Sequence, residues 1–81
     1  MNYFQQYERE RKFKPGVIWV TKENCQVPIT KFKIIYKWPM INNWTWIKPL
    51  EVTDDIHKWL IGIPKAIRKI ELEHYYVQST N

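Results

Sequence analysis

Alternation of apolar and polar positions is clearest between residues 29 and 38 (ITKFKIIYKW). An extended strand points successive side chains to opposite faces of its sheet. One face of this strand would carry Phe32, Ile34, Tyr36 and Trp38. The other face would carry Lys31, Lys33, Ile35 and Lys37. The segment therefore predicts a strand with an apolar face toward the core and a row of lysines in solvent. Pro39, which cannot donate a hydrogen bond to a neighbouring strand, is expected to end it.

Two shorter segments are also typical of strands, because they combine β-branched and aromatic residues. The first is residues 17–21 (VIWVT), and residues 22–24 (KEN) predict the turn of a hairpin into the next strand. The second is residues 44–48 (WTWIK), which follow a turn at residues 42–43. Pro49 is expected to end this strand.

Two helices are predicted. Residues 2–13 suit a short N-terminal helix, which Asn2 can cap. A second helix would begin after Thr53 as its capping residue and would end at Gly62 and Pro64. The apolar residues of this second helix follow the i, i+3, i+4, i+7 spacing that places a stripe against a core. They are Ile56, Trp59, Leu60 and Ile63.

The segment from residue 69 to residue 77 (KIELEHYYV) fits two interpretations. A strand would place Ile70, Leu72, His74 and Tyr76 on one side. A helix would instead align Ile63, Ile67, Ile70, His74 and Val77. We favour the strand, because tyrosine and valine are better strand formers than helix formers.

Together these elements predict one α+β domain spanning residues 1–81, since a chain of this length has room for one core. We expect a small, mostly antiparallel sheet of about four strands packed against one helix, with the short N-terminal helix beside it. The pattern leaves the order of the strands open.

Composition narrows the class of protein. Hydrophobic residues make up 44% of the chain, which favours a compact core over disorder. No apolar run approaches the roughly 20 residues that cross a bilayer, and residues 1–6 lack the pattern of a signal peptide. We therefore expect a soluble, cytoplasmic protein with no membrane partner. Cys25 is the only cysteine, so it forms no internal disulfide and no cysteine-rich zinc site, and we expect it to fill space in the core.

Residues suited to catalysis are few. The only serine, Ser79, lies in the expected C-terminal tail, and the two glycines, Gly16 and Gly62, belong to no phosphate-binding loop. His57 and His74 could serve as the acid and base of a metal-free ribonuclease, but their spacing does not bring them together. We expect a protein that is not an enzyme and has no catalytic residues, no metal site and no cofactor.

The net charge of +5 is unevenly distributed. Residues 1–48 hold nine Lys and Arg against three Glu, a charge of +6, whereas residues 49–81 hold four against five acids, a charge of −1. Such a basic region favours a polyanionic partner. The candidate phosphate contacts are Lys31, Lys33, Lys37, Lys48, Arg9, Arg11, Lys12 and Lys14. The alternative is that the strand lysines only keep an exposed sheet soluble.

Five tryptophans are more than a core of this size can easily enclose. Trp19, Trp38 and Trp59 occupy positions that match the core-facing pattern. Trp44 and Trp46 share one face of a predicted strand, and we expect one or both to be exposed unless they pack beneath the N-terminal helix. Exposed indoles beside lysines can stack on bases. They can equally well anchor a protein partner.

Across its whole length, the Lys-, Ile-, Asn- and Trp-rich composition of the chain resembles that of the small proteins of AT-rich bacteriophages. Many such proteins bind RNA, or bind and disable a host enzyme such as a toxin ribonuclease or a CRISPR effector, and the resemblance implies a place in the host cytoplasm. We predict a small, basic, non-catalytic nucleic-acid-binding protein with weak sequence specificity, RNA being favoured. One alternative is a phage-type inhibitor of a host defence or toxin enzyme, acting with or without RNA. A third is a structural component of a larger particle, which would form a homo-oligomer.

Overall fold

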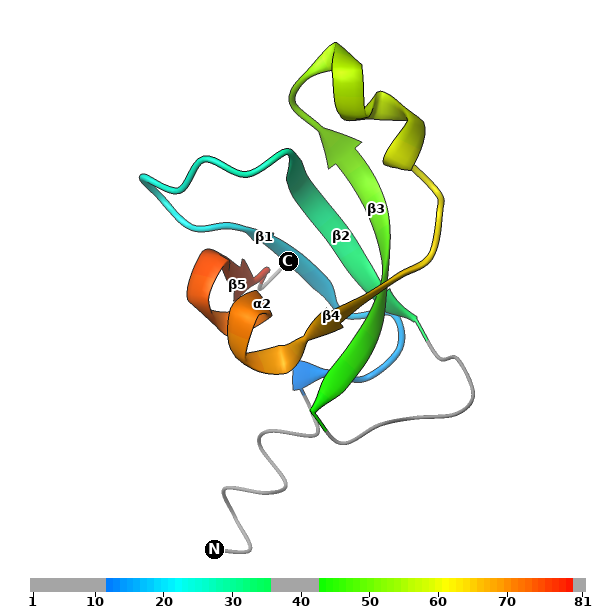
Figure 1. The fold of residues 1–81 in the computed structure, drawn as a ribbon. Coiled ribbons are helices and arrows are strands. Elements are labelled where there is room, and N and C mark those ends of the chain that lie inside the picture. Colours follow the sequence, from blue (N-terminus) through cyan, green and yellow to red (C-terminus); the bar gives the residue numbers. More distant parts are fainter. Residues whose placement is uncertain (1–11, 36–42, 80–81) are drawn as a thin grey trace, which may run out of the picture.

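The computed structural model describes residues 12–35 and 43–79, which form five strands, a 3-10 helix and an α-helix (Figure 1). The strands are β1 (Ile18–Thr21), β2 (Ile29–Ile35), β3 (Trp44–Val52), β4 (Lys65–Arg68) and β5 (Tyr76–Gln78). The 3-10 helix η1 (Asp55–Leu60) joins β3 to β4, and the α-helix α2 (Lys69–Tyr75) joins β4 to β5. The α+β class is confirmed, with five strands in place of the four expected. The N-terminal helix expected at residues 2–13 lies almost wholly outside the described residues.

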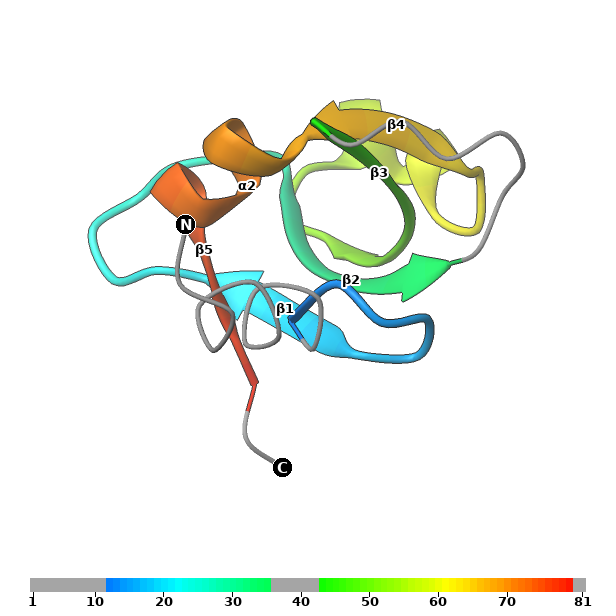
Figure 2. The same ribbon diagram turned by 90° about the horizontal axis from the view of Figure 1, so that it is seen from below.

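The five strands form one sheet in the order β4-β3-β2-β1-β5, and every neighbouring pair is antiparallel. β1 to β4 follow one another as a meander, and β5 returns to the free edge of β1. Figure 2 shows that the sheet is strongly curved, and α2 carries the chain from the β4 edge to the β5 edge. The curvature gives the sheet an inner face that holds the core and an outer face in solvent.

Aromatic rings make up much of the core. Phe13 and Trp19 stack with ring centroids 5.5 Å apart, Trp19 stacks on Phe32 at 6.4 Å, and Phe32 meets Tyr76 edge-on at 4.7 Å. The Tyr76 hydroxyl donates a 2.7 Å hydrogen bond to the Ile29 carbonyl, which satisfies the one polar atom of a buried ring. The other buried apolar residues in the described part of the chain are Ile29, Ile34, Ile47, Pro49, Val52 and Leu72.

The alternation read from residues 29–38 is confirmed for residues 31–35 of β2, whereas Ile29, which would fall on the lysine side, is also buried because the register shifts on each side of Lys31. Phe32 and Ile34 are 0% and 1% exposed, whereas Lys31 and Lys33 are half-buried on the other face. Tyr36, Lys37 and Trp38, the remainder of the predicted strand, lie outside the described residues. Trp19 is buried in the core as predicted.

Pro49 lies inside β3 and not at its end, so the prediction that the strand stops there is wrong. It is the partner of Phe32 in the β2–β3 ladder and is fully buried. Its carbonyl accepts a 2.9 Å hydrogen bond from the Gly62 N–H, on the side away from β2. The N and O atoms of a strand residue point to the same side, so the nitrogen of Pro49 also faces away from β2. The missing N–H therefore costs the β2–β3 ladder nothing.

The predicted helix after Thr53 is also corrected, because its residues form a 3-10 helix whose apolar side chains are largely exposed. Asp54 and not Thr53 caps it. With three residues per turn, Ile56 and Trp59 eclipse one another on one face, and Leu60 lies on a different one. Leu60 packs against the core, while Ile56 is 80% exposed and Trp59 is 65% exposed. The prediction that Trp59 lies in the core is therefore wrong.

The strand favoured for residues 69–77 is wrong for most of its length, since Lys69–Tyr75 form α2 and only β5 is extended. β4 pairs with β3 as far as Arg68 and Trp44, and the Lys69 N–H bonds to the Asn43 carbonyl (2.9 Å) where β3 begins. Beyond this point β3 offers no backbone partner, so the following peptide groups are satisfied within a helix. The helical stripe expected through Ile70 is also wrong. Leu72 is the buried residue of α2, and Ile70 is 71% exposed.

Candidate nucleic-acid interface

Three lysines gather on the outer face of the sheet, where β2 and β3 run side by side. Lys33 is the direct partner of Lys48 in the ladder, and Lys31 precedes Lys33 on the same face. Their chain neighbours Phe32 and Ile47 are buried on the inner face, which fixes the outward direction of the lysines. We call Lys31, Lys33 and Lys48 the lysine face.

No described carboxylate forms an ion pair with any residue of the lysine face. Glu51 is the ladder partner of Lys31, so this end of the lysine face has an acid nearby. Lys33 and Lys48 instead face each other across the β2–β3 ladder. Like charges directly opposite one another destabilise a sheet. The Lys33–Lys48 pair is therefore the most strongly positive part of this surface among the described residues.

The face of β3 that carries Lys48 also carries Trp46 and Trp44, at alternate positions about 6.8 Å apart. Buried and more exposed residues alternate along this part of β3. Thr45 and Ile47 are buried, Trp46 is half-buried, and Trp44 is 39% exposed. The prediction that the two indoles share a face is confirmed, and Trp44 is the more exposed of them. Lys48 and the two indoles therefore follow one another along one face of β3.

Arg68 is part of this surface, although no pattern in the sequence singled it out. It is the β4 partner of Trp44, and its guanidinium carbon lies 5.8 Å from the centre of the indole ring, a cation–π contact. The contact joins residues that are distant in sequence and depends on a β3–β4 pairing that the sequence does not reveal.

The other predicted phosphate contacts are not gathered at this site. Lys12 and Lys14 are exposed in the segment before β1 and are not part of β2 or β3. Arg9, Arg11 and Lys37 lie outside the described residues. The structure thus brings together Lys31, Lys33 and Lys48 with Trp44 and Trp46.

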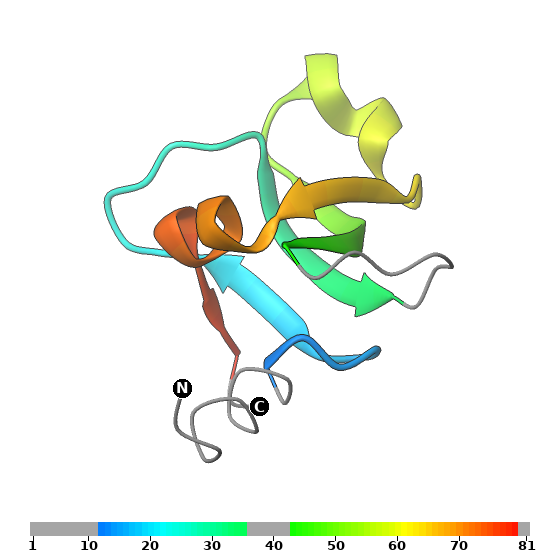
Figure 3. The same ribbon diagram turned by 60° about the horizontal axis from the view of Figure 1, so that its bottom comes forward.

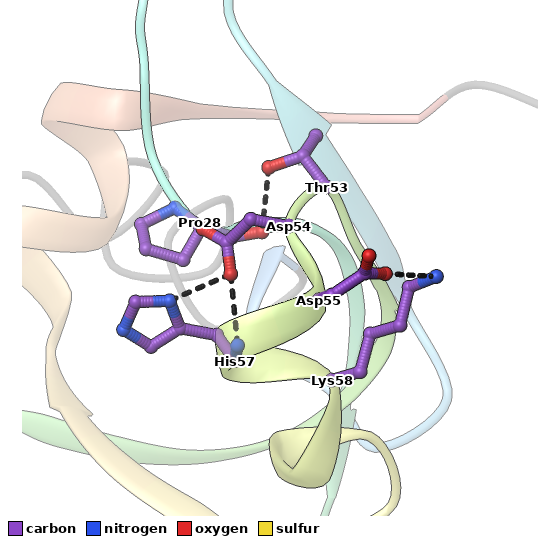
Figure 4. A network of polar contacts seen from close by, with 6 residues as sticks. All are labelled: Pro28, Thr53, Asp54, Asp55, His57 and Lys58. Atoms are coloured by element: carbon purple, nitrogen blue, oxygen red, sulfur yellow. Dashed lines mark hydrogen bonds and ion pairs between the residues drawn. The ribbon is translucent and has the colours of Figure 1, made fainter.

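A second polar cluster lies at the start of η1 (Figure 4). One Asp54 carboxylate oxygen accepts a 2.8 Å hydrogen bond from the His57 backbone N–H and a 2.7 Å bond from the His57 ring nitrogen Nδ1. These bonds, the side-chain bond first, lower the pKa of Asp54 from its ordinary value. Thr53 Oγ1 donates to the Pro28 carbonyl at 3.3 Å, and Lys58 pairs with Asp55 at 2.8 Å. The cluster caps and orients the 3-10 helix.

The described residues do not bring the two histidines or a set of metal ligands together. No group of three or more His, Cys, Asp or Glu within residues 12–35 and 43–79 is arranged to hold a metal ion. His74 lies on α2, with its ring centroid 4.7 Å from that of Tyr75. His57 lies on η1, and η1 and α2 are well separated in Figures 1 and 3. Cys25, expected in the core, is half-buried in the loop between β1 and β2.

An exposed apolar surface lies on η1 and the turn after it. Ile56 and Trp59 stand on one face of the helix, and Ile61 and Ile63 follow, each almost half exposed. We call these four residues the η1 patch. β3 runs from Trp44 to Val52 and η1 begins at Asp55, so the patch and Trp44 lie at opposite ends of this strand (Figure 1).

A scan against protein-family models found no match, and neither did searches of curated protein sequences and of solved structures. In the part of the chain that the structure describes, no helix has the length and apolar character needed to cross a bilayer.

Proposed function

We propose that this protein is a small, non-catalytic nucleic-acid-binding protein that holds a single strand along the outer face of its sheet. Phosphates of the ligand contact the lysine face, and its bases lie toward Trp44. Binding depends weakly on sequence, because lysines contact phosphates and only base-edge contacts specify sequence. The preference for RNA over DNA rests on the resemblance of the chain's composition to that of small bacteriophage proteins, many of which bind RNA.

The observation that carries this proposal is the Lys33–Lys48 pair. Two ammonium groups that face one another across a ladder, with no carboxylate paired to them among the described residues, raise the energy of the free protein. A phosphate bound between them relieves the repulsion and forms two charge-assisted hydrogen bonds. The adjacent indoles supply the flat surfaces on which bases of any identity can stack.

The test replaces both members of the pair. The double variant Lys33→Glu, Lys48→Glu still has two like charges facing each other, so the repulsion that destabilises the sheet is similar to that in the native protein. A control, Lys22→Glu with Lys65→Glu, makes the same change in net charge at two exposed lysines outside the lysine face. Affinity for single-stranded RNA, measured by fluorescence anisotropy at low salt, should fall about tenfold or more in the first variant, since each charged hydrogen bond contributes about 1.5–3 kcal/mol. Equal losses in the two variants would refute a specific lysine face.

The η1 patch favours a second candidate function, binding of a protein partner such as a host defence or toxin enzyme. The eclipsed side chains of Ile56 and Trp59 have the exposure and chemistry of an interface anchor, since tryptophan is frequent at interface hot spots. The sequence pointed to Trp44 and Trp46 for this role, but Trp59 is more exposed than Trp44, 65% against 39%.

This second function predicts that Trp59→Ala abolishes capture of a protein partner from host extract after nuclease treatment and at high salt, while Trp44→Ala does not. Capture that disappears with nuclease would identify RNA as the bridge. Sedimentation of the purified protein would reveal the third alternative, a homo-oligomer, if Trp59→Ala converts an oligomer to a monomer.

A further inference from the structure

A hollow of about 370 Å³ lies where the start of β3 meets the junction of β4 and α2. It is lined by Asn43, Trp44, Arg68, Lys69 and Ile70. Two contacts hold its walls together: Arg68 is the ladder partner of Trp44, and the Lys69 N–H bonds to the Asn43 carbonyl. The walls therefore belong to the sheet and not to a separate loop.

The side chains around the hollow provide three kinds of contact. Trp44, which is 39% exposed, contributes an indole ring, and the planar cation of Arg68 lies over that ring at 5.8 Å from its centre. Asn43 is exposed, and its side-chain amide has both a donor and an acceptor. Ile70 adds an apolar surface that is 71% exposed. A flat aromatic ring with polar groups on its edge matches all three.

We propose that this hollow is a subsite for one unpaired nucleobase of the bound strand, which rests on the proposed function above. The base stacks against Trp44 with Arg68 beside it, and its edge pairs with the Asn43 amide. Ile70 covers the far side of the base or its ribose. A bare phosphate would use Arg68 but would leave the indole and Ile70 without a partner, so the apolar walls favour a base.

The position of the hollow along β3 fits this assignment. Lys48 and Trp44 are four residues apart on one face of the strand, about 13 Å in extended chain. A single strand whose phosphates contact Lys33 and Lys48 can therefore place a base two or three nucleotides further on in the hollow. A base paired in a duplex keeps its edge occupied and its faces stacked, so the subsite selects single strands.

The experiment compares two ligands of equal charge: an RNA of about ten nucleotides and an abasic ribose-phosphate strand of the same length. The ratio of their Kd values isolates the contribution of the bases. The native protein should bind the RNA about tenfold or more tightly than the abasic strand, as expected for one stacked base. Trp44→Ala should remove most of this preference, and Trp44→Phe should retain part of it. Trp59→Ala, which removes an exposed indole elsewhere, should leave the ratio unchanged.

Asn43→Ala tests the edge contact without disturbing the fold, because Asn43 contributes only its backbone carbonyl to the contacts with α2. It should lower the ratio about threefold, the value of one hydrogen bond. An unchanged ratio in both Trp44→Ala and Asn43→Ala would overturn the subsite, as would equal binding of both ligands by the native protein. In that last case the lysine face still stands as a phosphate-binding surface. Failure to bind either ligand would refute the proposed function and the subsite together.

Discussion

Lys33 of β2 and Lys48 of β3 are direct partners in an antiparallel ladder, with both side chains on the outer face of the sheet. Cross-strand partners on one face lie close enough for their charges to interact. The repulsion within the pair therefore couples the stability of the sheet to the binding of an anion. A substitution that removes the repulsion should raise the stability of the free protein and lower its affinity for the anion.

Lys48→Glu should stabilise the free protein and weaken RNA binding. The substitution turns a like-charge pair into an opposite-charge pair, which contributes about 0.2–1 kcal/mol in a sheet. Urea unfolding and RNA titration of the same preparation measure the two effects. Lys48→Gln is the control, and its free energy of unfolding should lie between that of the native protein and that of Lys48→Glu. A loss of both stability and affinity would indicate that Lys48 is needed for the fold instead.

RNA affinity should depend on salt to the extent that the lysine face predicts. Three phosphate contacts give a slope of log affinity against log salt of roughly −2, at about −0.7 per contact for a single strand. Lys33→Glu with Lys48→Glu should make the slope shallower by more than one unit. A steep slope that persists in this variant would assign the contacts to other cations of the chain.

Trp59→Ala should change the free energy of unfolding by no more than about 0.5 kcal/mol, as expected for an exposed position. Trp19→Ala, at the buried indole that stacks between Phe13 and Phe32, should cost about 3–5 kcal/mol. Chemical denaturation followed by far-UV circular dichroism measures both. A large loss from Trp59→Ala would place this indole in the core, as the sequence pattern first suggested.

Leu72→Ala should destabilise the protein by about 2–5 kcal/mol, because Leu72 is the fully buried side chain of α2. Ile70→Ala, two residues earlier and exposed, should have an effect within about 0.5 kcal/mol. Were residues 69–75 a strand with Ile70 and Leu72 on one side, the two substitutions would have similar costs. Thermal unfolding of the pair distinguishes these outcomes.

Burial raises the pKa of Tyr76 from 10.0 to about 12. The folded state therefore holds the phenolic proton more tightly than the unfolded state, and the stability that follows is complete below pH 10 and is lost as pH rises toward 12. The difference in unfolding free energy between the native protein and Tyr76→Phe should shrink over this window. A constant difference would mean that Tyr76 ionises alike in both states. At neutral pH the variant should be less stable by about 1 kcal/mol, because the Ile29 carbonyl loses its hydrogen bond.

The α+β class, β1, the β1–β2 hairpin and the two faces of β2 could be predicted from the sequence, because each depends on local periodicity and turn chemistry. Asn24, in the predicted turn, has a positive φ of 68°, a conformation that asparagine tolerates better than most residues. The shared face of Trp44 and Trp46 was accessible for the same reason. Residues two apart point to the same face in any extended segment, whatever its partners are.

Tertiary structure decided the elements for which local pattern and available partners disagreed. Residues 69–75 alternate like a strand, but beyond Lys69 the described part of β3 offers no partner for their backbone hydrogen bonds, and they form a helix. Pro49 continues β3 because its nitrogen faces away from β2. The apolar spacing around Trp59 fits an α-helical stripe, yet the six-residue 3-10 helix turns that indole outward.

The candidate site divides along the same line. Local alternation was enough to predict that Lys31 and Lys33 leave one face of a strand, and the count of five tryptophans predicted that one or more would be exposed. Only the pairing of β2 with β3 and of β3 with β4 set Lys33 opposite Lys48 and Arg68 against Trp44. Cross-strand register depends on how every strand buries its inner face at once, and no single segment contains that information.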